Sequence, residues 1–152
     1  MLFRKAKMSD VENIYNLINL YADKGLMLHR TLPNLYQKIR EFTIIEKNGV
    51  IIGVGSLHIL WKDLAEICSL AIHPEHTNNG LGMGMVNKLI GESKELEIER
   101  VFTLTYQPEF FQKCGFTSIE KEELPQKVWM ECINCPKFPN CDEMALIKNL
   151  TI

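Results

Sequence analysis

The sequence has little net charge and no long hydrophobic run, and each of these shortages excludes a class of protein. Lys and Arg number 17 against 19 Asp and Glu, a formal net charge of -2, so we expect no cationic surface for nucleic acid or anionic membranes. No apolar run approaches the roughly 20 residues that span a bilayer. Residues 1–5 lack the features of a signal peptide. We therefore expect a cytoplasmic protein that binds neither nucleic acid nor membrane.

The length and the cysteine spacing limit the possible domain organisation. The 152 residues, 46% hydrophobic and 24% charged, are typical of one soluble globular domain. The five cysteines are an odd number, and Cys132, Cys135 and Cys141 crowd the tail. This pattern suits reduced thiols or a metal better than a disulfide framework. We assign residues 1–128 to the main domain and residues 129–152 to a Cys-rich tail packed on it.

The first third of the chain predicts a strand and two helices. Residues 3–6 have the pattern of a short strand, and Ser9 and Glu12 follow with the spacing of a capping box. Apolar residues then recur at helical spacing over 9–22. A second, shorter helix is predicted over about 33–39, because proline suits a first helical turn.

The rest of the chain predicts a mixed sheet. Asn48-Gly49 between two apolar runs indicates a hairpin of strands over 42–46 and 50–60, and a third strand follows over 65–72. Helical spacing returns over 80–93, before a further strand and a short helix, which are expected at 100–105 and around Phe110 and Phe111. Hairpins followed by a β-α-β unit predict an α/β fold, an α+β sandwich whose mixed, mostly antiparallel sheet is flanked by helices.

A glycine-rich turn joins the third strand to the next helix. Gly80, Gly82 and Gly84 let successive backbone N–H groups converge on one anion, and the helix dipole adds to the attraction. The turn does not fit a Rossmann unit, because antiparallel strands precede it, and it lacks the Gly-Lys-Ser/Thr of a Walker loop. Spacing alone leaves two interpretations open: an anion site, or a turn whose glycines allow close helix packing.

Two motifs resemble those of a known family. Residues 72–76, Ile-His-Pro-Glu-His, with Gly80-Leu81-Gly82 resemble the acetyl-CoA pyrophosphate loop of the GNAT acetyltransferases, and residues 110–116 resemble their late helix–strand signature. Over residues 2–128 the chain looks like the acetyltransferase domain of N-acetylglutamate synthases, without the amino-acid-kinase domain of the long forms, and so like a short, stand-alone form. The matching blocks are Gly25-Leu26-Met27-Leu28, Arg30-Thr31, Phe42-Thr43-Ile44-Ile45, Ala65-Glu66-Ile67, Leu70-Ala71-Ile72, Val101-Phe102-Thr103-Leu104-Thr105 and Leu124-Pro125.

The resemblance implies an enzyme that moves the acetyl group of acetyl-CoA to the α-amino group of L-glutamate, a step of arginine biosynthesis, by direct attack in a ternary complex. Thr77 stands where the family usually has Arg or Gln, so backbone amides would hold the pyrophosphate. Phe111 replaces a Tyr that protonates the leaving thiolate in many relatives, which is tolerable because a thiol of pKa about 8.5 leaves readily. The implied acetyl-CoA-binding residues are Leu70, Ala71 and Ile72, whose N–H groups would meet the oxyanion, with Asn79, Gly80, Leu81, Gly82, Met83 and Gly84.

Transfer to an ammonium needs a base, because the amine must first lose a proton. Glu66, on the strand that splays in this family, is the candidate, and a solvent-facing strand-end Glu is the alternative. His58 and His73 are rival bases, and we interpret His73 as a surface turn residue. Arg30 and Lys127 match basic positions of the family and would bind the two carboxylates of glutamate. Solvated basic side chains are the alternative.

The tail carries a separate pattern. Cys132, Cys135 and Cys141 form C-x2-C-x5-C within a proline-containing segment, as a zinc knuckle presents its thiolates. Tetrahedral zinc needs four ligands, so Asp142, a distant residue or a second chain would have to complete the site. The other interpretation is three reduced thiols that pack the tail on the domain.

Other functions stay open from the sequence. One is a GNAT enzyme for another amino acid, a small amine or a protein N-terminus. The other is a non-catalytic acyl-CoA-binding or metal-sensing module. A homodimer is compatible with either function.

Overall fold

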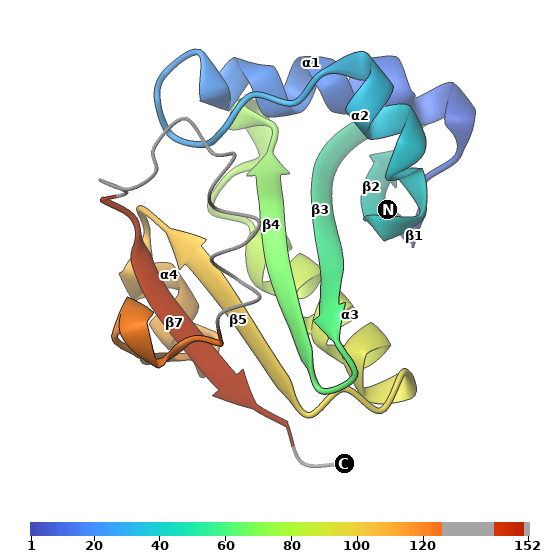
Figure 1. Cartoon of the computed structure of the whole chain (residues 1–152). Helices are drawn as coiled ribbons and strands as arrows, with labels where there is room; N and C mark the ends of the chain where they lie inside the picture. Colours follow the sequence, from blue (N-terminus) through green and yellow to red (C-terminus); the bar gives the residue numbers. More distant parts are fainter. Residues whose placement is uncertain (126–141, 151–152) are drawn as a thin grey trace.

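The computed structural model describes residues 1–125 and 142–150. Its centre is a seven-stranded sheet in the order β1-β2-β3-β4-β5-β7-β6, drawn in Figure 1. Every neighbouring pair is antiparallel except β4 and β5. The predicted mixed, mostly antiparallel sheet is therefore confirmed. The strands are β1 Leu2–Lys5, β2 Phe42–Lys47, β3 Val50–Trp61, β4 Leu64–Ile72, β5 Arg100–Thr105, β6 Thr117–Ser118 and β7 Met144–Asn149.

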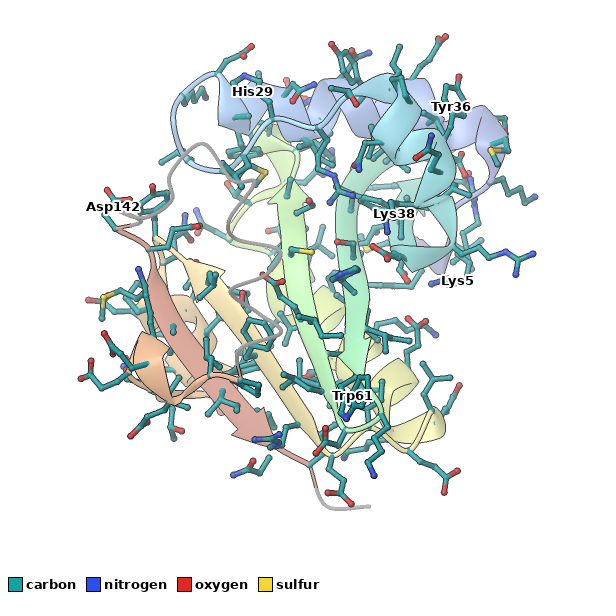
Figure 2. The ribbon with its side chains drawn as sticks, in the orientation of Figure 1. Lys5, His29, Tyr36, Lys38, Trp61 and Asp142 are labelled. Carbon is teal, nitrogen blue, oxygen red and sulfur yellow. The ribbon has the colours of Figure 1, made fainter. Side chains whose placement is uncertain are left out.

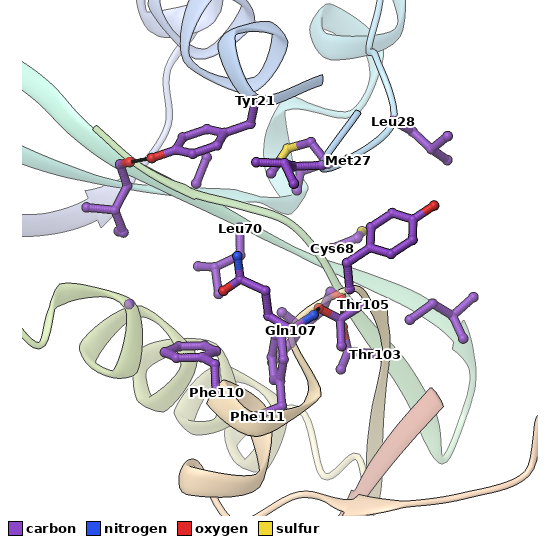
Figure 3. Close-up of a pocket in the computed structure, with 18 of the residues that line it drawn as sticks. Tyr21, Met27, Leu28, Cys68, Leu70, Thr103, Thr105, Gln107, Phe110 and Phe111 are labelled. Carbon is purple, nitrogen blue, oxygen red and sulfur yellow. Dashed lines mark hydrogen bonds between the residues drawn. The ribbon is translucent and has the colours of Figure 1, made fainter. Parts of the chain in front are cut away.

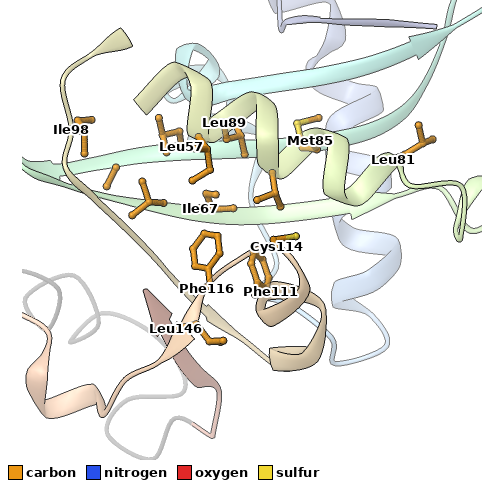
Figure 4. Packing of buried hydrophobic residues seen from close by; sticks show 14 of the residues in the cluster. Leu57, Ile67, Leu81, Met85, Leu89, Ile98, Phe111, Cys114, Phe116 and Leu146 are labelled. Carbon is orange, nitrogen blue, oxygen red and sulfur yellow. The ribbon is translucent and has the colours of Figure 1, made fainter. Parts of the chain in front are cut away.

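Helices cover both faces of the sheet. Helix α1 packs against α2 and β2 in a cluster that includes Ile14 and Ile44. Helices α3 and α4 pack on the opposite face through Met85, Leu89 and Phe111 (Figure 4). Across the described ranges, no helix combines the length and the apolar content that a bilayer crossing requires. The helices are α1 Val11–Ala22, α2 Leu32–Gln37, α3 Leu81–Glu95 and α4 Pro108–Lys113, with 3-10 turns at Met8–Asp10, Ile39–Glu41, Pro74–His76 and Lys121–Glu123.

The predicted turn between β2 and β3 is present. Asn48 and Gly49 have φ values of 52° and 79°, which are the two left-handed positions that a tight hairpin turn needs. Glycine adopts this conformation at no steric cost, and asparagine at little. The parallel pairing of β4 with β5 across α3 also confirms the predicted β-α-β unit.

The start of α1 differs from the prediction. The helix begins at Val11, and Ser9 lies inside the preceding 3-10 turn. The Asp10 carboxylate accepts hydrogen bonds from the Lys7 backbone N–H at 2.7 Å and from the Arg4 guanidinium at 2.8 Å. The bond from Arg4 holds the pKa of Asp10 below its usual range. A tertiary ion pair therefore sets the helix start, and the predicted cap at Ser9 is wrong.

Strand β7 was not expected from the sequence. It lies between β5 and β6 and pairs with both, so that Ile147 is opposite Phe102 on one side and Thr117 on the other. Ala145 and Leu146 of this strand are buried. Its six residues are too short for a decisive strand pattern on their own, and their partners are distant in the chain. Part of the segment we described as a tail is therefore an internal strand of the sheet.

Candidate active site

The parallel strands β4 and β5 separate partway along their length. Their pairing is confined to residues 64–66 of β4 and 100–102 of β5, and beyond it the two ribbons diverge (Figure 1). At the fork, the Thr103 hydroxyl donates to the Ile67 carbonyl at 2.9 Å, which satisfies a β4 acceptor past the end of the ladder. A cavity of about 950 Å³ lies here, lined by β4, the 26–30 loop and the starts of α3 and α4.

Strand β4 contains a bulge beside this cavity. Between the pairs Val54–Ala71 and Ser56–Cys68 the register shifts, so that Ser69 and Leu70 together oppose a single residue of β3. Ser69 has a φ of 54°, in the left-handed region. A bulge disrupts the ladder and leaves its extra residue unpaired. Both bulge residues, Ser69 and Leu70, line the cavity, and Leu70 is where the sequence predicted the oxyanion contacts.

The glycine turn forms the opposite end of the cavity. Gly80 is the N-cap of α3, with φ 75°, so the N–H groups of Leu81, Gly82 and Met83 begin the helix without intrahelical partners. All four residues line the cavity. These amides and the helix dipole form a site suited to a pyrophosphate.

Gly84 and Gly82 have different roles in the glycine turn. The Gly84 N–H donates to the Gly80 carbonyl at 3.0 Å, and a Cβ on Gly84 would lie 3.1 Å from the Phe3 ring. Gly84 therefore serves helix packing, and its engaged amide is not available to a ligand. A Cβ on Gly82 would lie 3.1 Å from the Phe110 ring, and this glycine also lines the cavity. Of these two glycines, Gly82 is therefore the one that both packs closely against a neighbouring ring and lines the cavity.

Two other residues predicted around the turn lie outside the cavity lining. Asn79 is exposed. His73 caps the turn Pro74–His76, where its side chain accepts a hydrogen bond from the Glu75 N–H at 3.2 Å. His73 is therefore placed as a turn residue. Nearby, the Tyr21 hydroxyl donates to the Ile72 carbonyl (Figure 3), and burial raises the pKa of Tyr21.

Strand alternation separates apolar from polar side chains at the centre of the sheet. Leu57 and Ile67 belong to the core beneath α3 (Figure 4). The neighbouring residues point to the other face, because successive side chains of a strand alternate. In register on that face are Ser56 with Cys68 and His58 with Glu66. His58, Glu66 and Cys68 all line the cavity, so the predicted base and its rival histidine occupy one surface.

A carboxylate missed by the sequence analysis joins this surface. Glu41, at the end of the 3-10 turn before β2, places Oε2 2.8 Å from the His58 Nδ1. Both side chains are about one fifth exposed, at 18% for His58 and 21% for Glu41. Nothing in the spacing of residues 41, 58 and 66 signals their contact. The order of strands β2, β3 and β4 in the sheet produces it.

Arg30 is held in position on the cavity wall. Its Nε donates to the Asn34 Oδ1 at 2.7 Å and its Nη1 donates to the Ser69 Oγ at 3.0 Å. The guanidinium lies over the Phe42 ring, 5.1 Å from its centroid. These contacts fix the plane of the guanidinium while leaving further N–H donors for a ligand. Lys38 and Lys121 line the same cavity and were missed from the sequence.

Cys68 lines the same cavity, opposite Ser56 of β3. The Ser56 hydroxyl donates to the Cys68 carbonyl at 2.8 Å and lies 3.1 Å from its Sγ. Burial, and then the Glu66 carboxylate, raise the pKa of Cys68 to about 12. The thiol is therefore protonated at neutral pH, and a protonated thiol is a poor nucleophile. This environment therefore does not activate the Cys68 thiol as a nucleophile.

The structure does not describe the remaining predicted site residues. Lys127, Cys132, Cys135 and Cys141 lie outside the described residues. Within the part of the chain that the structure describes, no group of three or more His, Cys, Asp and Glu side chains is arranged to hold a metal ion.

Comparison with known proteins gives consistent results. The model of the acetyltransferase (GNAT) family matches residues 9–116. An uncharacterized N-acetyltransferase of Chlorobaculum tepidum is 39% identical over 147 residues, covering 97% of this chain and 95% of that protein. An amino-acid acetyltransferase of Mycobacterium tuberculosis is 39% identical over 131 residues, covering 84% of this chain and 75% of that protein.

Two solved structures extend the likeness to the whole fold. A Mycobacterium tuberculosis protein in complex with CoA and NLQ has a TM-score of 0.88 at 33% identity, covering 99% of this chain and 100% of that chain. N-acetylglutamate synthase from Neisseria gonorrhoeae, complexed with coenzyme A and N-acetyl-glutamate, has a TM-score of 0.91 at 27% identity. The match covers 99% of this chain and 35% of that one.

Proposed function

The chain belongs to the GNAT family of acetyltransferases, and from this premise we propose that it acetylates the α-amino group of L-glutamate. Family membership makes it an acetyl-CoA-dependent N-acetyltransferase. The choice of acceptor rests on one observation. Arg30, a fixed cation, and Glu66, a carboxylate, line the same cavity that ends at the glycine turn.

Acetyl-CoA would bind along this cavity. Its pyrophosphate would meet the N–H groups of Gly80 to Met83 at the start of α3. The pantetheine would follow β4 through the fork, which brings the thioester carbonyl to the bulge at Leu70. Backbone N–H groups of Leu70 to Ile72 would stabilise the oxyanion that develops there. Asn79 contributes less in this arrangement than the sequence suggested, because it lies outside the lining.

The acceptor would occupy the polar face of β3 and β4. Arg30 would bind a carboxylate of glutamate through its remaining N–H donors, a strong charge-assisted contact. Lys127 is retained as the proposed partner of the second carboxylate. Glu66 would take a proton from the ammonium, and the free nitrogen would attack the thioester carbonyl.

The transfer then proceeds without a covalent acetyl-enzyme. The new C–N bond forms as the C–S bond breaks, and the sulfur leaves as a thiolate. The nitrogen loses a second proton, which the thiolate accepts. Phe111, buried in the cavity wall, cannot donate a proton to the leaving sulfur. The thiolate is a weak base, so it can leave without a general acid.

The decisive test is release of free thiol from acetyl-CoA across the amino acids. We expect the largest kcat/KM for glutamate, with glutamine and aspartate as the matched comparisons of charge and length. Turnover of alanine as efficient as that of glutamate would remove the glutamate assignment and leave an acetyltransferase of another acceptor. Binding of acetyl-CoA with no turnover of any amine would support the non-catalytic alternative.

Finer consequences follow from the same proposal. If glutamate is the acceptor, the product belongs to arginine biosynthesis, and we propose that the protein acts in the cytoplasm. The zinc site of Cys132, Cys135 and Cys141 stays a prediction. Metal analysis of the purified protein distinguishes it from three reduced thiols, and sedimentation tests the homodimer.

A further inference from the structure

Helix α2 turns one side to the cavity and the other to solvent. Tyr36 of this helix and His29 of the loop before it lie on the outer surface of the molecule (Figure 2), where both are exposed. Asn34 and Lys38 are four residues apart and line the cavity together with Arg30. Residues with this spacing share a face of a helix, so the inner side of α2 lies beside Arg30.

The main chain of Arg30 is held by helix α1. The Oδ1 of Asn19 accepts a hydrogen bond from the Arg30 N–H at 3.3 Å, and the Nδ2 of Asn19 donates to the Arg30 carbonyl at 3.2 Å. Both polar groups of the Arg30 main chain are therefore paired with one side chain. With the main chain fixed in this way, the direction of the guanidinium depends on the contacts of its own side chain.

Those contacts restrict how a carboxylate can approach Arg30. The Nε of arginine carries a single hydrogen, and the Asn34 Oδ1 accepts it at 2.7 Å. The Phe42 ring covers one face of the guanidinium. A bidentate bond to a carboxylate uses two nitrogens of the planar fork. Since Nε is engaged, the two nitrogens left for a carboxylate are Nη1, which has a second hydrogen besides the one directed at Ser69, and Nη2.

We propose that Asn34 is a positioning residue for the acceptor, because it holds Arg30 by its Nε so that the Nη1–Nη2 edge receives the carboxylate. The proposal rests on the proposed function, in which Arg30 binds a carboxylate of the amino acid. Asn34 acts through the guanidinium and does not itself bind the acceptor.

Asn34 is well fixed for this role. Its backbone N–H donates to the Oγ1 of Thr31, the N-cap of α2, at 3.2 Å. The next residue, Leu35, is fully buried and packs in the cluster that joins α2 to α1. A side chain whose own backbone is anchored gives a functional group a more precise position than a loose one does.

The position of the guanidinium matters because it is also tied to the bulge of β4. Ser69, which accepts the bond from Nη1 at 3.0 Å, precedes Leu70, where the thioester carbonyl would arrive. A carboxylate held by Arg30 is therefore placed relative to the reacting centre. A misplacement of about 1 Å costs on the order of 100-fold in rate when reacting groups must be aligned.

The experiment compares the unmutated enzyme with Asn34→Ala and with Asn13→Ala, using the amino acid that is acetylated fastest. We expect Asn34→Ala to raise the KM for this acceptor about 10-fold, the lower end for a charge-assisted bond. The KM for acetyl-CoA should not change. Alanine favours helix more than asparagine does, so α2 should persist. Asn13 is an exposed asparagine of α1 outside the cavity lining, and Asn13→Ala should match the unmutated enzyme.

A double variant separates positioning from a structural role. Arg30→Ala combined with Asn34→Ala should have the same acceptor KM as Arg30→Ala, because the group through which Asn34 acts is already gone. A further loss in the double variant overturns the proposal. So does an unchanged KM in Asn34→Ala beside a raised KM in Arg30→Ala. If Arg30→Ala itself leaves the KM unchanged, the acceptor-binding role of Arg30 in the proposed function fails, and the positioning role fails with it.

NMR of the Arg30 Nε–H tests the contact without turnover. The signal is identified by its loss in Arg30→Lys. We expect this hydrogen to exchange with water more slowly than that of the exposed Arg40, and Asn34→Ala to raise its exchange rate. If no amino acid is acetylated, the proposed function fails, while the exchange rate still decides whether Asn34 holds Arg30. Equal exchange in the unmutated protein and in Asn34→Ala would contradict the proposal.

Discussion

The two ends of the cavity are built from different parts of the chain. The proposed cofactor end is formed by backbone at the start of α3 and at the bulge in β4. At the proposed acceptor end, side chains from the 26–30 loop, the turn before β2, β3 and β4 line one cavity. A glycine turn can be recognised locally because its function needs only a short, side-chain-free backbone. The acceptor surface depends on strand order and register, which no local pattern contains.

This difference predicts different sensitivities. Substitutions at the acceptor end should change the chemistry or the selectivity for the amine, while acetyl-CoA still binds. Substitutions in the turn should act through acetyl-CoA. Four variants test this separation.

The largest effect is expected for Glu66→Gln. Removing the proposed base should lower kcat by about 10²- to 10⁴-fold, because glutamine has a similar shape and accepts no proton. The Kd for acetyl-CoA, measured by calorimetry, should stay nearly unchanged. Glu99→Gln, an exposed position outside the cavity, is the control. If Glu66→Gln retains the kcat of the unmutated enzyme, Glu66 is not the base.

Gly82→Val tests the cofactor end. Its side chain would meet the Phe110 ring and stand between the backbone and a pyrophosphate. Each charge-assisted hydrogen bond lost costs roughly 1.5–3 kcal/mol, so acetyl-CoA affinity should fall by about 100-fold or more. Gly91→Val lies in the same helix with nothing within 4 Å of its Cβ and controls for the propensity of valine. If a folded Gly82→Val protein still binds acetyl-CoA tightly, the pyrophosphate does not bind at this turn.

Arg30→Ala should change selectivity for the acceptor. Loss of one charge-assisted bond to a carboxylate should raise the KM for glutamate about 10- to 150-fold, while the KM for acetyl-CoA hardly moves. Arg40→Ala removes an exposed arginine that does not line the cavity and should have no such effect. If Arg30→Ala raises the KM for glutamate and for alanine by the same factor, Arg30 does not bind a side-chain carboxylate.

The smallest effect is expected at Cys68. With a pKa raised to about 12, its thiol should be alkylated by iodoacetamide far more slowly at pH 8 than an ordinary thiol, and faster as the pH rises. Cys68→Ala should leave kcat near that of the unmutated enzyme. Mass spectrometry identifies the modified cysteine. Rapid alkylation at pH 8 or a large loss of kcat would make a nucleophilic thiol part of the mechanism.

The errors of the sequence analysis share one physical cause. The cap of α1 was placed at Ser9 from local spacing, but the ion pair of Asp10 with Arg4 of β1 sets the helix start. Strand β7 was missed because six residues show little pattern without β5 and β6 beside them. The three glycines of the turn look equivalent in sequence, whereas only the tertiary contacts of Gly82 and Gly84 tell them apart.

The sequence by itself determined the hairpin at Asn48-Gly49, the helix after the glycine turn and the family resemblance, because turn chemistry and hydrophobic period are local properties of the chain. It also singled out Arg30 and Glu66 through family motifs. Only the tertiary structure decided that Glu41 meets His58 and that His58 faces Glu66. Those contacts depend on strand register, since a slip of one residue would turn each side chain to the opposite face of the sheet.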